Sequence, residues 1–320
     1  MQEKLNSSIL KILAYFDLFQ YPLSAEEIQK FLDQKAGAAQ LSAALDWLVL
    51  QRLVFPHGDW YSLRSDSRIM EERRLKNDQA KPMLALARRI SGFLFHFPFV
   101  RGIGISGSLS KNCADSNTDI DFFIITRKNR LWIGRTIMHF FKKLTFLTGH
   151  QHWYCMNYYI DESALCIEEK NIFTAVELAT LLPVQGKPVL DQFFKSNNWI
   201  MSYFPNQPER TAITVQHPGL LSLKKMIEYL FNNMLGDWLD NYLMRLTTRR
   251  WKLKEDQFEL NIKGNRMGLR TGKHYSKPNP VFFQERILSL HRIRFIELQE
   301  KLQAVLRLNK DQPFFLKEII

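Results

Sequence analysis

Cysteines and long apolar runs are scarce in this sequence of 320 residues. Its three cysteines, Cys113, Cys155 and Cys166, form no CxxC pair and no metal-ligand spacing, which excludes a disulfide scaffold and a zinc ribbon. Free thiols of this kind are typical of a reducing compartment, so we expect a cytoplasmic protein. No uncharged apolar run reaches the roughly 18 residues of a membrane span, and the first residues lack a signal-peptide cleavage site. The sequence therefore predicts no membrane partner.

Acidic residues are outnumbered, since 44 Lys and Arg stand against 32 Asp and Glu and give a net charge of +12. A surplus of this size favours anionic partners such as nucleic acid, nucleotides or acidic membranes. It is unevenly distributed, because residues 1–53 are close to neutral whereas residues 245–320 hold 17 basic and 8 acidic side chains. The position of the surplus favours a nucleotide as the anionic ligand.

The length and a hydrophobic content of 46% suit about two domains with buried cores. We expect an α+β protein with three consecutive parts: a winged-helix-like domain at 1–66, a domain with a small mixed sheet at 67–210, and a basic helical C-terminal region at 211–320. In the middle part, strands are predicted at 99–105, 120–126 and 153–160 and helices at 67–76, 82–95 and 131–148. In the last part, helices are predicted at 220–253 and 281–308, separated by a loop rich in Gly, Lys and Arg at 263–280.

The N-terminal 66 residues contain three segments with helical apolar spacing, followed by a hairpin around a Pro-His-Gly-Asp turn. Ser24 and Glu27 form a capping box at the start of the second helix. This order of elements resembles the winged-helix family. The third helix has few basic residues to contact phosphates, so DNA is a possible but not a favoured partner, and an interaction or packing module is favoured.

The segment expected to carry chemistry is residues 104–126, GISGSLSKNCADSNTDIDFFIIT. Asp119 and Asp121 stand at alternate positions entering a strand, so their carboxylates point to the same face. Such a pair of hard oxygen ligands suits Mg²⁺. Gly107 and Ser108 follow directly on a strand, where a glycine lets backbone N–H groups approach a phosphate and a serine hydroxyl can donate to it.

Ser110 and Lys111, which follow the Gly-Ser turn, can extend this phosphate cradle. Together with the spacing to the Asp-x-Asp motif, the segment resembles the signature of the DNA polymerase β-type nucleotidyltransferase superfamily. The resemblance implies that two Mg²⁺ ions are held by Asp119 and Asp121. It also implies that a nucleoside triphosphate (NTP), such as ATP, is bound at Gly107 and Ser108.

Catalytic members of this superfamily carry a third carboxylate on a later strand. The matching strand here contains Asn157 at the expected place, an amide that cannot act as a base. Asp161, Glu162 and Glu177 are the nearby acids that can substitute for it.

The sequence leaves two main hypotheses for the function open. The first is Mg²⁺-dependent transfer of a nucleoside monophosphate from an NTP to an unidentified acceptor: an RNA end, a protein hydroxyl, an antibiotic or a small metabolite. The alternative is a catalytically degenerate nucleotide-binding protein whose winged helix contacts DNA or a protein. A third hypothesis, a metal-dependent glycosyltransferase that uses its Asp-x-Asp on a sugar nucleotide, leaves the Gly-Ser turn unexplained.

Overall fold

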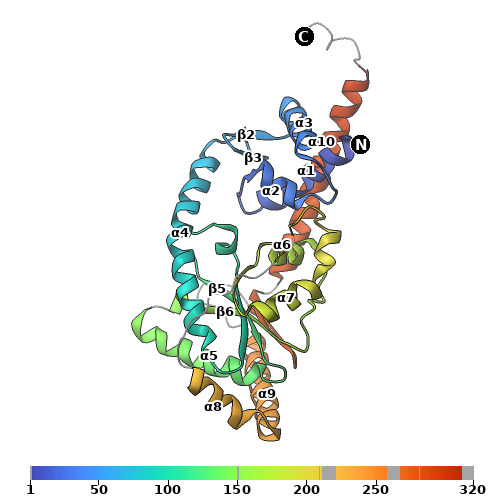
Figure 1. Ribbon diagram of the computed structural model, residues 1–320. Helices are drawn as coiled ribbons and strands as arrows, with labels where there is room; N and C mark the ends of the chain where they lie inside the picture. The colour runs from blue at the N-terminus through green and yellow to red at the C-terminus, as the bar shows by residue number, and fades with distance from the viewer. Residues whose placement is uncertain are drawn as a thin grey trace. The chain divides into compact units, whose positions relative to one another are not determined.

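The computed structural model describes residues 2–149, 151–208, 210, 221–257, 267–280 and 282–311 (Figure 1). The chain packs as two compact units. The first comprises Met1–Leu75, Ile200–Pro208 and Gln284–Ile320, and the second comprises Lys76–Trp199 and Glu209–Phe283. The expected division into three consecutive parts therefore differs from the structure, because the last helix belongs with the N-terminal elements and the rest of the C-terminal region belongs with the central sheet.

The first unit has the helices and the hairpin that the sequence predicts, in the predicted order. Its elements are α1 (Gln2–Asp17), β1 (Leu23–Ser24), α2 (Ala25–Phe31), α3 (Ala38–Leu50), β2 (Phe55–His57) and β3 (Trp60–Ser62). The short strand β1 adds to the hairpin and makes an antiparallel sheet of order β1-β3-β2. The capping box is confirmed: Glu27 N donates to Ser24 Oγ at 3.2 Å, and Ser24 N donates to Glu27 Oε2 at 2.9 Å.

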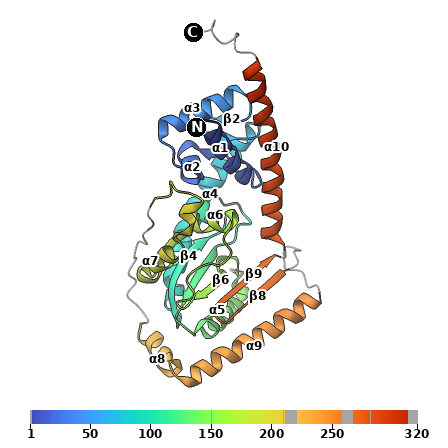
Figure 2. The ribbon, with the colours of Figure 1, turned by 90° about the vertical axis from the view of Figure 1, so that its right-hand side faces the viewer.

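The long helix α10 (Phe283–Asp311) runs beside the N-terminal helices (Figure 2), and polar contacts join it to α1. His291 Nε2 lies 2.9 Å from Lys11 O, and Gln299 donates to Ser7 Oγ at 3.0 Å. Nearby, Arg294 and Arg64 both donate to the buried carboxylate of Asp17. These contacts explain why the C-terminal helix forms one unit with the N-terminal helices.

The second unit is built on a six-stranded mixed sheet of order β7-β4-β5-β6-β9-β8, which confirms the α+β class. Its strands are β4 (Val100–Ser106), β5 (Asp121–Thr126), β6 (Cys155–Asp161), β7 (Leu182–Gln185), β8 (Met267–Thr271) and β9 (Tyr275–Pro280). Only β5 and β6 pair in parallel, and α5 (Leu131–Thr145) lies between them in the chain. All other neighbouring strands are antiparallel.

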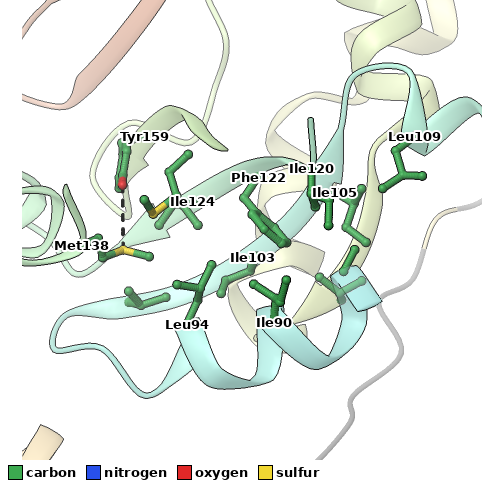
Figure 3. Close-up of a cluster of buried hydrophobic side chains, with 14 of the residues drawn as sticks. Ile90, Leu94, Ile103, Ile105, Leu109, Ile120, Phe122, Ile124, Met138 and Tyr159 are labelled. Carbon is green, nitrogen blue, oxygen red and sulfur yellow. Dashed lines mark hydrogen bonds between the residues drawn. The ribbon is translucent and has the colours of Figure 1, made fainter. Parts of the chain in front are cut away.

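Helices cover both faces of this sheet. On one face, Ile90 and Leu94 of α4 (Arg68–Phe95) and Met138 of α5 share a buried cluster with Ile103 and Phe122 (Figure 3). On the other face lie α6 (Ile172–Thr180) and α7 (Lys187–Ser196). The Phe123 ring of β5 contacts the Phe193 ring of α7 there, with centroids 4.9 Å apart. Adjacent residues of β5 therefore face different layers.

Two helix predictions need correction. The helices expected at 67–76 and 82–95 are one continuous helix, α4, with Pro82 inside it. Ala80, Ala87 and Leu94 are fully buried at intervals of seven residues, so one apolar face continues past the proline. Conversely, the helix expected at 220–253 is divided into α8 (Leu221–Phe231) and α9 (Met234–Asp256), because Asn233 caps the start of α9 by accepting a hydrogen bond from Gly236 N.

The prediction of a loop at 263–280 is also wrong for the part of it that the structure describes. Residues 267–280 form the hairpin β8–β9, which extends the sheet beyond β6, so the C-terminal region is not wholly helical. Its prolines are tolerated because β9 pairs with β6 only through Tyr275 and Ser276, which leaves Pro278 and Pro280 outside that ladder. Lys263 and Arg266 lie outside the described residues. No helix in the described ranges is long and apolar enough to cross a membrane.

Candidate functional site

The Gly-Ser turn follows β4 directly and lies against the first residue of β5. Ser106 pairs with Asp121 in the antiparallel register, and the next residue, Gly107, adopts φ +70°. A Cβ at Gly107 would overlap the Oδ2 atom of Asp121. Glycine is therefore required at this position for two reasons: the backbone is left-handed, and the Asp121 carboxylate leaves no space for a Cβ.

The three residues predicted to bind phosphate after Gly107 differ in what their side chains contact. Ser110 is buried and donates to Gly107 O at 2.8 Å. Lys111 Nζ donates to the same oxygen at 3.0 Å and forms an ion pair with Glu177 Oε1 at 2.8 Å. Ser108 is exposed, and its side chain makes no hydrogen bond with any residue that the structure describes. Ser110 and Lys111 thus hold the turn in shape, and Ser108 presents its hydroxyl to solvent.

Asp119 and Asp121 lie on the same face of the sheet, as predicted from their spacing. Ile120 between them is fully buried and continues the parallel ladder: Ile120 N donates to His152 O at 3.0 Å, and Cys155 N donates to Ile120 O at 3.2 Å. Because side chains alternate along extended backbone, burial of Ile120 turns both carboxylates to the opposite face. Asp119 Oδ1 also lies 2.7 Å from His152 Nδ1.

Asn157 is the residue of β6 that reaches the carboxylate pair. The β5–β6 register shifts between Phe122 and Phe123, which leaves Asn157 as the extra residue of a bulge, and its Nδ2 donates to Asp121 Oδ1. The Cys155 thiol donates to Asn157 Oδ1 at 3.0 Å and so orients the amide. Burial, and then the negative charge of Asp121, raise the pKa of this thiol to about 12, so it keeps its proton.

Of the acids considered for a third carboxylate, two lie at the far end of the sheet. Asp161 is paired with Thr126, five residues along β5 from Asp121 and thus about 16 Å away at 3.3 Å per residue. It is fully buried and contacts Ser163 N at 2.8 Å and His274 Nδ1 at 2.9 Å, which is a structural role. Glu162 accepts a hydrogen bond from Lys128 N. Glu177 alone among the three is joined to the Gly-Ser turn, through Lys111.

Two basic side chains of the β8–β9 hairpin are paired with one carboxylate. Arg270 and Lys277 both donate to Glu169, Lys277 at 2.8 Å. Although burial alone would raise it, the pKa of Glu169 is lowered by the hydrogen bond from Lys277 and by the charges of both cations. These two residues therefore neutralise a glutamate at the edge of the sheet.

The donor set fits a Mg²⁺ ion that completes its coordination with substrate. Within the described ranges, no group of three or more His, Cys, Asp and Glu side chains could hold a metal. Mg²⁺ is commonly bound by only one or two protein carboxylates together with waters and substrate phosphates. Asp119 and Asp121 supply two such carboxylates, and that of Asp121 lies against Gly107 of the Gly-Ser turn.

Comparison of the chain with models of known protein families, with curated proteins and with solved structures gives no match. We therefore infer the function from the fold and from the geometry of the site.

We predict that Gly107→Ala is more destabilising than Gly149→Ala. Both glycines have a positive φ, +70° and +71°, but a Cβ at Gly149 meets nothing within 4 Å. The Gly149 variant should lose only the backbone term of about 1–2 kcal/mol. The Gly107 variant should lose that amount and at least about 1 kcal/mol more, because Asp121 must move. Denaturant unfolding measures both losses, and equal losses would contradict the close contact.

Proposed function

We propose that this protein is a Mg²⁺-dependent nucleotidyltransferase that moves a nucleoside monophosphate from an NTP to an acceptor hydroxyl or phosphate. The observation that carries the proposal is the position of two carboxylates on one sheet face, Asp119 and Asp121, beside the Gly107-Ser108 turn. A carboxylate pair beside a glycine turn provides ligands for a cation and backbone N–H groups for the phosphates that accompany it.

In this function each residue has a separate role. Asp119 and Asp121 hold the cation, which when bound neutralises charge on the phosphates. The Gly107 backbone and the Ser108 hydroxyl position the leaving phosphates. The acceptor oxygen forms a bond to the α-phosphorus in line with the bond that breaks, and pyrophosphate leaves. Rate enhancement comes from positioning and charge neutralisation, as in other phosphoryl-type transfers.

Lys111 and Glu177 support the turn in this proposal. Lys111 contacts the carbonyl of Gly107 and the carboxylate of Glu177, so its charge is balanced while no nucleotide is bound. A triphosphate arriving at Gly107 and Ser108 would compete with Glu177 for this ammonium group. The ion pair therefore keeps a cation at the edge of the site without leaving it unpaired.

Asn157 favours a second function, nucleotide binding without transfer. An amide donates to Asp121 where a third carboxylate would accept the proton of the acceptor. Pyrophosphate release separates the two functions. Turnover with an NTP, Mg²⁺ and an acceptor panel supports the enzyme, and nucleotide binding without turnover over the whole panel supports the binding protein.

We predict that replacing both carboxylates, Asp119→Ala with Asp121→Ala, weakens binding of Mg²⁺–NTP by about 100-fold or more, because charge-assisted contacts to the cation are lost. Titration calorimetry with ATP, CTP, GTP and UTP measures the affinity. The matched control is Glu162→Ala with Glu168→Ala, which changes the net charge equally at exposed positions and should leave the affinity unchanged. If the carboxylate variant and the parent bind Mg²⁺–NTP with equal affinity, the proposed site is wrong.

We predict that Asn157→Asp tightens binding of Mn²⁺, used as a probe for Mg²⁺, by about tenfold, since the variant adds a third carboxylate at Asp121. The same change should lower the melting temperature without metal, because three carboxylates then repel one another. Asn157→Ala is the control. Its affinity for Mn²⁺ should not increase, and Mn²⁺ should not raise its melting temperature as it raises that of the aspartate variant. Unchanged Mn²⁺ affinity in the aspartate variant would show that residue 157 does not face the cation.

A further inference from the structure

The helices α8 and α9 carry charged side chains on the side that packs against the rest of the second unit. On α8, Lys224 is buried and donates to Phe95 O at 2.7 Å and to Val100 O at 2.8 Å. One turn later, Glu228 accepts hydrogen bonds from Arg101 and from Phe99 N, each at 2.7 Å. The polar face of α8 is therefore turned inward and is satisfied there.

The same orientation holds for α9. Asp237 forms an ion pair with the buried Arg130, and the buried Asp240 accepts a hydrogen bond from Ile133 N at 2.9 Å. Arg130 further donates to Phe231 O at 2.7 Å, which ties the junction of the two helices to the start of α5. These contacts fix which face of α9 is left to solvent.

The side left to solvent is apolar. Six large side chains on it are each more than half exposed, with relative exposures from 54% to 87%. We call them the apolar face, and they are Met226, Tyr229, Leu230, Met234, Leu235 and Trp238. The Trp238 ring is stacked on the ring of Tyr242, with centroids 5.5 Å apart and 7° between the planes. Figures 1 and 2 both show α8 and α9 meeting at one corner of the second unit.

The size of the apolar face is that of a stable interface. An aromatic side chain buries about 150–250 Å² and a Leu or Met side chain somewhat less, so six that are more than half exposed offer on the order of 700 Å². The largest apolar patch on a typical monomer is about 300–600 Å². Each partner in a stable protein–protein interface contributes about 800 Å².

We infer that this apolar face is the surface through which two copies of the chain form a symmetric dimer. Its six members carry no charge, and Lys224, Glu228 and Asp240 beside them make their polar contacts on the inward side of the two helices. Two copies can therefore meet there despite the net charge of +12 on each chain. A two-fold interface needs only one self-complementary surface, and permanent homodimer interfaces are the most apolar class.

An anionic membrane surface is a weaker fit, because membrane-binding helices place several cations beside their apolar residues. Within residues 223–242, all of which the structure describes, Lys225 is the one exposed cation, and the next exposed cation along α9 is Arg245.

The test is the mass of the full chain in solution, by light scattering on a sizing column and by sedimentation from about 1 to 100 μM, a range that covers micromolar association. The parent should have twice the monomer mass. Tyr229→Glu with Trp238→Glu should weaken association at least about 100-fold, since both are exposed aromatic anchors of the interface. Far-ultraviolet circular dichroism should be unchanged, because both side chains are more than half exposed and, among the described residues, the stacking of Trp238 on Tyr242 is the one ring contact that the substitutions remove. The control, Leu50→Glu with Leu308→Glu, alters equally exposed residues of the first unit and should remain dimeric.

A parent that stays monomeric at the highest concentration overturns the inference, and so does a dimer that the double variant retains. Binding of a monomeric parent to vesicles with anionic lipid, lost on the same substitutions, would assign the face to a membrane instead. If the double variant fails to fold, Met234→Asp at the most exposed position repeats the comparison with a single change.

Discussion

Burial of Ile120 against the cluster beneath α4 and α5 is the constraint on which the candidate site depends. An extended chain alternates its side chains, so a buried Ile120 turns Asp119 and Asp121 to the opposite face together. The antiparallel register of β4 and β5 then places the Gly107 turn against Asp121, and the parallel register of β5 and β6 brings Asn157 to the same carboxylate. The position of the polar groups thus follows from an apolar face, and each carboxylate has a local polar contact, Asp119 with His152 and Asp121 with Asn157.

Features that depend on neighbouring residues could be predicted from the sequence. The capping box at Ser24, the strands on either side of the Gly-Ser turn and the common face of the two aspartates belong to this class. Features that depend on distant pairing could not. The contact between Asn157 and Asp121 requires a bulge, the ion pair of Lys111 with Glu177 joins residues 66 positions apart, and the β8–β9 hairpin joins the sheet by pairing with the distant strand β6. Single-residue rules also failed where packing was stronger, as at Pro82, which lies within a helix whose apolar face continues past it.

Basic residues of the C-terminal region, which the sequence suggests as ligands of a nucleotide, are in part paired with carboxylates of the protein itself. In the described part of the C-terminal region, Arg270 and Lys277 neutralise Glu169, and Arg294 contacts Asp17. Cations near the Gly-Ser turn come instead from Lys111, which the fold holds between a carbonyl and a glutamate. In α8 and α9, too, charged side chains on the inward side are paired, and apolar side chains remain exposed on the outer side. Several charged side chains in the described part of the second unit therefore join elements of its fold.

The central claim is that Asp119 and Asp121 form a cation site beside a phosphate-binding turn. Its most direct test is a crystal of the protein soaked with Mn²⁺ and a non-hydrolysable NTP, with anomalous differences measured at the manganese edge. We expect an anomalous peak between the two carboxylates, with the triphosphate at the backbone of Gly107 and the hydroxyl of Ser108. Nucleotide bound elsewhere, or manganese bound only at other acids, would contradict the claim.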